Sequence, residues 1–218
     1  MKTALVFGSS GLIGGHLLNE LIQSDNYNKI KLFVRSDHGS NHSKTEIIKT
    51  YFNNLENHKE DIKGDDCFFC IGTTKQNSPD KNEYKRVELD VPKKIAQIAK
   101  SNLVNSFVFV SSGYADPNSS GDYLKFKGLV EEELKRLSFS KLGIMRPSFL
   151  MGDRKEKRVG EKVGIFIFKL LSPLFLGPLK KMKPIHSKKV AKAMIKITNG
   201  DFKQNVFESN EIVEVSNS

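Results

Sequence analysis

The stretch "VFGSSGLIGGHLL" (residues 6–18) joins a short apolar run to a helical pattern through a turn that carries Gly8, Gly11 and Gly14. The run "TALVF" (3–7) leading into the turn is typical of a buried strand. Glycines in such a turn let the backbone approach a pyrophosphate closely, and the amide groups that begin a helix favour negative charge. The spacing is Gly-x-x-Gly-x-x-Gly instead of the commoner Gly-x-Gly-x-x-Gly. The turn predicts dinucleotide binding by Gly8, Ser10, Gly11, Leu12, Ile13 and Gly14.

Strand and helix patterns alternate outward from this turn. The run "SFVFVSS" is apolar and β-branched almost throughout, which is typical of a strand buried on both faces. Pro92 falls early in one of the amphipathic helices or kinks it. The alternation predicts an α/β fold with a doubly wound, Rossmann-like parallel sheet and helices on both faces. Strands are expected at 3–7, 29–34, 46–52, 67–72, 106–112 and 141–147, and helices begin after Gly11 and cover 86–101 and 127–137.

The length of 218 residues fits a single domain, 1–218. Residues 151–192 interrupt the alternation and hold 12 Lys and Arg against 3 Asp and Glu, so they carry most of the net charge of +10. We expect them to form a short helical flap over the substrate pocket. Their apolar residues flanked by lysines also suit a membrane surface, although two prolines and Lys169 argue against a spanning helix. The charge fits either an anionic substrate or a solvated lysine-rich face, and no nucleic-acid-binding motif accompanies it.

The cysteines and histidines give no sign of a metal or redox site. Cys67 and Cys70 have the Cys-x-x-Cys spacing, but residues three apart in a strand point to opposite faces, so we expect two inert core thiols. The five histidines have no metal-ligand spacing. The glycine-rich N-terminus is unlike a secretory signal peptide, and we expect a cytoplasmic protein.

The end of the second predicted strand indicates which cofactor binds. An acidic residue there holds a ribose 2′-hydroxyl, whereas an arginine pairs with a 2′-phosphate. This chain has Arg35 followed by Ser36, which favours NADP over NAD. Asp37 is the residue that keeps NAD possible.

Tyr123 and Lys127 lie four residues apart and share a face if a helix begins near Ser119 to Asp122. A phenol has a reference pKa of about 10, and a nearby ammonium favours its phenolate, so this tyrosine can exchange a proton with a carbonyl oxygen or an alcohol. Ser112, or alternatively Ser111, follows a strand at the carboxyl edge of the sheet and is expected to orient the carbonyl.

The chain resembles the short-chain dehydrogenase/reductase superfamily and, within it, the atypical branch related to the Tat-interacting-protein oxidoreductases. The matching stretches are "GSSGLIG", "CFFCIGTT", "VELDVPKKIAQIAK", "FVFVSS", "YLKFKGLVEEEL" and "IMRPSFLMGDR". The resemblance implies that Gly72 and Thr73 lie along the cofactor and that residues 147–150, which include Pro147 and Ser148, flank the nicotinamide. Tyr51 departs from the pattern because relatives often carry an acid there, near the adenine. The tail after Arg154 leaves the substrate pocket unassigned.

These observations predict an NADP-dependent oxidoreductase that reduces a small carbonyl or oxidises an alcohol, with Ser112, Tyr123 and Lys127 as catalytic residues. The alternative is a non-catalytic nucleotide-binding protein that acts through a partner or a membrane surface. A sugar-nucleotide epimerase is disfavoured, because those relatives carry a larger carboxyl-terminal domain. The resemblance is compatible with a monomer or a homodimer, since the helix that carries Tyr123 often pairs between subunits in the wider superfamily.

Overall fold

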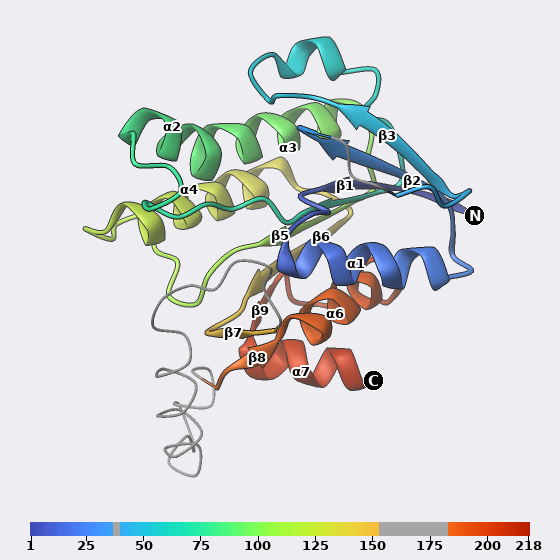
Figure 1. The fold of residues 1–218 in the computed structure, drawn as a ribbon. Helices are drawn as coiled ribbons and strands as arrows, with labels where there is room; N and C mark the ends of the chain where they lie inside the picture. Colours follow the sequence, from blue (N-terminus) through green and yellow to red (C-terminus); the bar gives the residue numbers. More distant parts are fainter. Residues whose placement is uncertain (37–39, 153–182) are drawn as a thin grey trace.

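The sheet has seven parallel strands in the order β3-β2-β1-β4-β5-β6-β9 (Figure 1). The computed structural model describes residues 1–36, 40–152 and 183–218. Strand order reverses between β1 and β4, which is the doubly wound arrangement expected from the sequence. The strands are β1 (Lys2–Phe7), β2 (Tyr27–Val34), β3 (Thr45–Lys49), β4 (Asp66–Phe69), β5 (Ser106–Val110), β6 (Lys141–Arg146) and β9 (Val206–Glu208).

Helices cover both faces of the sheet (Figure 1). Alternate residues of each strand point to opposite faces, so Ala4 and Val6 pack with one group of helices and Leu5 and Phe7 with the other. Both clusters are apolar, which gives the sheet two cores. On the first face lie α1 (Leu12–Gln23), α6 (Ser187–Asn199) and α7 (Ser209–Asn217); on the second lie α3 (Val91–Ser101) and α4 (Asp122–Leu137).

The helix that contains Pro92 is built in three parts. The α-helix α2 (Lys81–Lys85) runs into a π-helical turn, η2 (Arg86–Asp90), which continues as α3. Pro92 lies in the first turn of α3, where its missing N–H costs no hydrogen bond within that helix. The structure therefore places the proline early in α3, directly after a local widening of the helix.

The two cysteines pack on opposite faces of the sheet, as their spacing predicts. Cys67 belongs to the core beneath α3 and α4, and Cys70 packs against the core beneath α1. Both are free thiols. Burial raises the pKa of Cys67 well above its ordinary value and that of Cys70 to about 12, so both favour the unreactive thiol.

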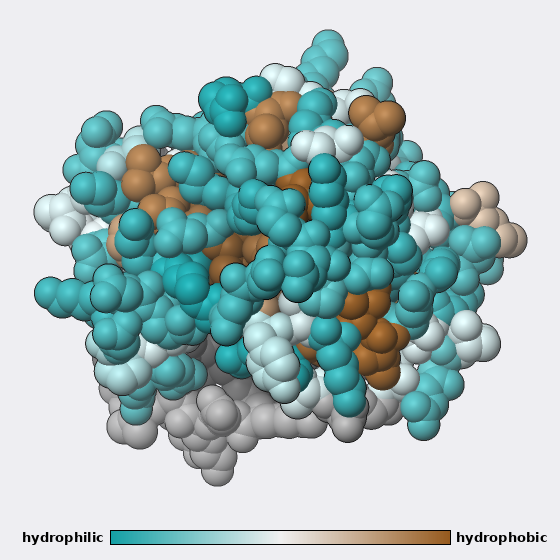
Figure 2. Space-filling model, turned by 90° about the horizontal axis from the view of Figure 1, so that it is seen from above, coloured by the Kyte–Doolittle hydropathy of each residue, from teal (hydrophilic) through white to brown (hydrophobic). Residues whose placement is uncertain are grey.

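The carboxyl-terminal third adds a second, small sheet. Strands β7 (Leu150–Met151) and β8 (Ile185–His186) pair in parallel. Of the predicted flap at 151–192, residues 153–182 lie outside the described residues, and residues 187–192 begin α6. No helix in the described ranges is long and apolar enough to cross a membrane. Seen from above, the molecule is mostly hydrophilic, with separate apolar areas (Figure 2).

Candidate cofactor-binding and catalytic site

The glycine turn between β1 and α1 is closely packed. Gly8 has a φ of +90°, and a Cβ there would lie 2.8 Å from backbone atoms of Cys70 and Ile71. A Cβ on Gly14 would lie 2.0 Å from the Gly8 carbonyl oxygen. Only glycine fits these two positions, and α1 therefore starts directly against the end of β1. Gly11 is the N-cap of α1, and no side-chain oxygen accepts from the first amide groups of the helix. These amide groups are therefore available to an anion.

The other predicted residues of this turn differ in exposure. Ser10 and Gly11 are exposed, Leu12 is half-buried and Ile13 is buried in the core. The Ser9 hydroxyl is buried and has no hydrogen-bond partner among the described residues. A buried unpaired hydroxyl in a turn of this shape fits a turn that receives a polar ligand.

Arg35 and Ser36 follow the end of β2 and are exposed. Hydrogen bonds from Arg86 lower the pKa of Glu83, and the positive charge of Arg35 lowers it further. The Arg86 guanidinium binds the Glu83 carboxylate of α2 at 2.7 Å. Asp37 lies outside the described residues.

Gly72 and Thr73 lie in the loop that follows β4. The Thr73 amide donates a hydrogen bond of 2.5 Å to Glu88 Oε1, and its hydroxyl is 2.9 Å from that of Ser78. Gly72 is exposed, and a Cβ there would lie 3.5 Å from the same Glu88 oxygen. The buried acid Glu88 therefore fixes the backbone of this loop.

Tyr123 and Lys127 lie on one face of α4, four residues apart. The Lys127 Nζ is 5.9 Å from the centroid of the Tyr123 ring. Tyr123 is 40% exposed, whereas Lys127 is only 3% exposed. The Lys127 ammonium is 3.0 Å from Glu88 Oε2 and donates to the Val110 carbonyl at 3.3 Å. Burial opposes the charge of Lys127, but Glu88 and Tyr123 outweigh it and raise the pKa of Lys127 above its ordinary value.

Helix α4 begins at Asp122, with Gly121 as its N-cap. No side-chain cap bonds the first turn, and the Ser119 hydroxyl accepts a 3.2 Å hydrogen bond from the Gly121 amide just before it. Gly128 has another role: a Cβ there would lie 2.3 Å from the Pro117 nitrogen. The loop after β5 therefore lies directly on α4 beside Tyr123, and the Asp116 amide donates to the Leu124 carbonyl at 3.1 Å.

The two candidate serines have different surroundings. Ser111 is buried and its hydroxyl donates to Glu131 Oε1 at 2.5 Å. Glu131 also accepts 2.9 Å and 2.6 Å hydrogen bonds from Arg146. Ser112 is half-buried, and its hydroxyl donates to the Gly113 carbonyl at 3.2 Å, its one hydrogen bond among the described residues. Ser111 is thus part of a buried ionic network, and Ser112 is the serine with a weakly held hydroxyl at the edge of the sheet.

Pro147 and Ser148 follow β6 beside this loop. The Gly113 amide donates to the Pro147 carbonyl at 3.0 Å. The Ser148 amide donates to the Ser209 hydroxyl at 2.7 Å, and its own hydroxyl donates to the Lys183 carbonyl at 2.5 Å. The segment is therefore joined to the serine loop on one side and to the start of α7 on the other.

Glu88 and Glu131 are the acids that sequence reasoning missed. Both belong to amphipathic helices, where a glutamate is ordinarily exposed, yet each is only 1% exposed. The position of Glu88 within "VELDVPKKIAQ" gives no local signal of burial. Its partner Lys127 lies 39 residues away, so only the tertiary structure brings the two together.

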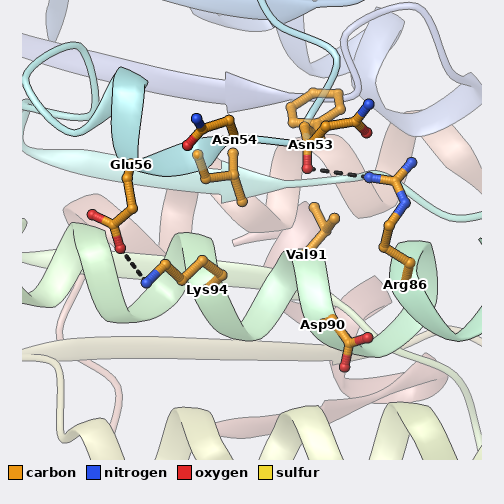
Figure 3. Close-up of a pocket in the computed structure, with 9 residues that line it drawn as sticks. Asn53, Asn54, Glu56, Arg86, Asp90, Val91 and Lys94 are labelled. Atoms are coloured by element: carbon orange, nitrogen blue, oxygen red, sulfur yellow. Dashed lines mark hydrogen bonds and ion pairs between the residues drawn. The ribbon is translucent and has the colours of Figure 1, made fainter.

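A cavity of about 260 Å³ lies between the segment after β3 and the start of α3. An ion pair between Glu56 of η1 (Leu55–His58) and Lys94 of α3 spans it (Figure 3). At the other end of the cavity, the Arg86 guanidinium donates to the Phe52 carbonyl at 3.1 Å. Neither Tyr123 nor Lys127 lines this cavity. The lining residues are Phe52, Asn53, Asn54, Leu55, Glu56, Arg86, Asp90, Val91 and Lys94.

Residues 8–200 match the model of a family described as NAD(P)H-binding. The match covers the glycine turn, the loop after β4 and the helix with Tyr123 and Lys127. The chain belongs to this family. Together with the relatives below, the match makes it an atypical short-chain dehydrogenase/reductase of the branch that includes HTATIP2, as the resemblance predicted.

Two curated relatives are similar over much of the chain. Protein HTATIP2 of Rattus norvegicus is 32% identical over 166 residues, which are 73% of this chain and 67% of the relative. Protein FMP52, mitochondrial, of Eremothecium gossypii is 30% identical over 221 residues, covering 97% of this chain and 96% of the relative.

Solved structures share the fold at low sequence identity. The UDP-N-acetylglucosamine 4-epimerase of Methanobrevibacter ruminantium has a TM-score of 0.71 at 20% identity, over 98% of this chain and 80% of that one. The Bordetella bronchiseptica enzyme WbmH, solved with NAD+, has a TM-score of 0.71 at 18% identity, over 100% and 80%. At these identities the likeness establishes the Rossmann-like fold and nothing finer.

The relatives correct the expected cytoplasmic location. FMP52 proteins of Eremothecium gossypii, Coccidioides immitis, Candida glabrata and Scheffersomyces stipitis are named as mitochondrial. The expectation relied on the glycine-rich start of the chain, which argues against a secretory signal peptide alone and carries no information about other compartments.

Proposed function

We propose that this NAD(P)H-binding protein is an NADP-dependent oxidoreductase that reduces a small carbonyl compound, or oxidises the corresponding alcohol, by hydride transfer. One observation carries the proposal. The half-exposed phenol of Tyr123 shares a face of α4 with the buried ammonium of Lys127, whose Nζ is 5.9 Å from the centroid of the Tyr123 ring, and this helix packs beside the loop carrying Ser112. A proton donor, a neighbouring positive charge and a hydroxyl donor are the groups that carbonyl reduction needs from the protein.

Each residue has a distinct role in this proposal. When bound, the nicotinamide supplies the hydride. The Ser112 hydroxyl donates a hydrogen bond to the substrate oxygen and orients the carbonyl. The Tyr123 hydroxyl then gives its proton to that oxygen as negative charge develops on it, which leaves a phenolate and an alcohol. The Lys127 ammonium stabilises the phenolate, because opposite charges attract strongly where water is excluded.

The glycine turn and the end of β2 support the choice of cofactor. The turn would receive the pyrophosphate against the start of α1. Arg35 and Ser36 are exposed directly after β2, where a 2′-phosphate would be bound. Arg86 lies one helical turn from Glu83 and binds its carboxylate, and the positive charge of Arg35 also lowers the pKa of Glu83.

Replacement of Tyr123 tests the chemistry. In a screen of small aldehydes and ketones followed by NADPH oxidation, Tyr123→Phe should lower kcat by about 10²–10⁴-fold, because the proton donor is lost while the ring remains. The exposed Tyr114 provides the matched control, and Tyr114→Phe should keep kcat within about threefold. Full turnover by Tyr123→Phe would refute the proposed mechanism.

Replacement of Arg35 tests the cofactor preference. Fluorescence titration of the wild-type protein should give a lower Kd for NADPH than for NADH. Arg35→Ala should raise the NADPH Kd by about 10–100-fold and leave the NADH Kd unchanged, since a charge-assisted pair with phosphate contributes about 1.5–3 kcal/mol. Arg136→Ala, on the exposed side of α4, is the control. Equal losses for both cofactors would show that Arg35 does not read the 2′-phosphate.

A further inference from the structure

Glu88 occupies a place between the two halves of the site. Its carboxylate is almost fully buried and has a different partner on each oxygen. Oε1 accepts a 2.5 Å hydrogen bond from the Thr73 amide, in the loop after β4. Oε2 is 3.0 Å from the Lys127 ammonium on α4. One side chain thus joins the loop expected along the cofactor to the lysine expected beside the reacting tyrosine.

From this geometry we propose that Glu88 is a positioning residue, which holds the Lys127 ammonium protonated and in place and fixes it relative to the Gly72–Thr73 loop. The proposal rests on the proposed function for the role of Lys127. Glu88 itself contacts no reacting atom and acts through its two partners.

The local backbone explains how a helical glutamate reaches this position. Glu88 lies in the π-helical turn η2, four residues before Pro92. In a regular α-helix the proline ring would collide with the carbonyl of the residue four positions earlier. The π turn accommodates Pro92 by widening the helix at Glu88, and such turns are frequent at functional sites. The sequence feature that appeared as a possible kink therefore serves to place a buried acid.

The charges around Lys127 leave Glu88 as its main counterion. Among the described residues, Glu88 is the acid within ion-pair distance of Nζ. The aromatic ring of Phe109 has its centroid 4.9 Å from Nζ and the Val110 carbonyl accepts from it, but neither carries a charge. The ionisable groups that face Lys127 are Glu88 from η2, Tyr123 and Glu131 from α4, and Cys70 from the end of β4.

Removal of the Glu88 carboxylate should lower the pKa of Lys127, because the effect of burial is then no longer offset by Glu88. Burial is the largest influence on Lys127 and favours the neutral amine, whereas Glu88 is the strongest influence in the other direction. A lysine without its buried partner loses its proton at lower pH. The neutral amine then stabilises a phenolate less, and proton transfer from Tyr123 becomes harder.

NMR of protein with labelled lysine side chains tests this directly. The chemical shift next to Nζ reports the charge of each lysine, and the Lys127 signal is the one absent from the Lys127→Arg spectrum. Glu88→Gln should move the Lys127 titration to lower pH by at least about 1 unit. Glu133→Gln, which removes another ion-paired acid from α4, should leave it in place. An unshifted Lys127 titration in folded Glu88→Gln would overturn the proposal.

A second pair of variants separates charge from loop support. Glu88→Gln keeps an oxygen that accepts from the Thr73 amide, so its Kd for NADPH should stay within about threefold of wild type, whereas Glu88→Ala loses both contacts and should bind about tenfold or more weakly. Equal NADPH affinities of Glu88→Gln and Glu88→Ala would refute the link to the loop.

If Glu88→Gln does not fold, Glu88→Asp retains the charge on a shorter side chain and should give a partial downward shift of the Lys127 titration. A wild-type titration in Glu88→Asp would then refute the positioning role.

The lysine titration requires neither substrate nor cofactor. Absence of carbonyl turnover in wild-type protein would therefore contradict the proposed function and leave the Glu88–Lys127 result standing. Conversely, a wild-type pH profile of turnover in Glu88→Gln would contradict the positioning role and leave the oxidoreductase proposal intact.

Discussion

Neighbouring side chains of the same type have different surroundings at this site, as Ser111 and Ser112 illustrate. The Ser111 hydroxyl is buried and bound to Glu131, which also holds Arg146. Arg146 donates in turn to the Ala115 carbonyl at 3.1 Å and so anchors the loop beyond Ser112. The buried serine is held in the network that anchors the loop, whereas the half-buried Ser112 is the one that we propose contacts a substrate.

Alanine substitutions should separate these two roles. Ser112→Ala should lower kcat by about 10²-fold or more, because a donor to the developing oxyanion is lost, with little change in stability. Ser111→Ala should lower the free energy of unfolding by about 1–3 kcal/mol, because the buried Glu131 loses a hydrogen bond. Denaturant unfolding and turnover with the same carbonyl substrate measure both. A larger loss of turnover in Ser111→Ala would reverse the assignment.

At the scale of elements, the turn between β1 and α1 depends on close backbone contact. Gly14 lies against the Gly8 carbonyl oxygen, and Gly8 lies against the chain leaving β4. Two strands and one helix therefore meet with no side chains between them. This contact brings the amino end of α1 to the same edge of the sheet as the loop of Gly72 and Thr73.

Two adjacent glycines provide a matched test of this contact. Gly14→Ala places a methyl group 2.0 Å from the Gly8 oxygen and should reduce stability by about 1–3 kcal/mol and weaken NADPH binding at least tenfold. In Gly15→Ala the nearest atom is 3.7 Å away, so the helix should gain about 0.5–1 kcal/mol and binding should persist. Thermal unfolding and NADPH titration give both quantities. Normal binding by Gly14→Ala would contradict the assigned role of the turn.

Across the whole molecule, the candidate chemistry and a buried polar network lie at opposite edges of the sheet. At the amino edge, the Tyr27 hydroxyl donates to Asp66 Oδ2 at 2.7 Å, and the Lys2 ammonium is 3.1 Å from the same oxygen. Thr198, at the end of α6, is 2.9 Å from the Tyr27 hydroxyl. This network joins β1, β2, β4 and α6 far from the carboxyl edge, where the site lies.

Tyr27 should make stability sensitive to alkaline pH. Burial, followed by the charge of Asp66, raises the pKa of Tyr27 far above its ordinary value. Its contribution is complete below about pH 10, where the unfolded phenol begins to ionise, and is lost as pH rises toward the folded-state pKa. Tyr27→Phe should cost about 1–3 kcal/mol at neutral pH and weaken the alkaline decline. Denaturant unfolding at neutral pH and above about pH 10 measures the free energy of unfolding, with the exposed Tyr51→Phe as control. An equal loss of stability at alkaline pH in wild type and Tyr27→Phe would contradict this prediction.

Local patterns predicted the central part of the fold well. The apolar runs correctly predicted β1, β2, β4, β5 and β6. The weaker run at 46–52 predicted β3, which the structure places at Thr45–Lys49. The sequence interpretation left out β9, α6 and α7. The helical spacing in "VAKAMIKITNG" was a signal for α6, but β9 has only three residues and is a strand because β6 has a free edge for it to pair with.

The sequence by itself determined the doubly wound fold, the glycine turn and the shared face of Tyr123 and Lys127, because these follow from periods and spacings within one or two elements. Only the tertiary structure decided which serine is buried, that Glu88 holds Lys127, and that Glu131 holds both Ser111 and Arg146. Burial and ion pairing arise from elements that are distant in the chain and adjacent in space. A glutamate on an amphipathic helix has the same local pattern whether it faces water or a lysine on a neighbouring helix, so its role becomes visible only when the helices are packed.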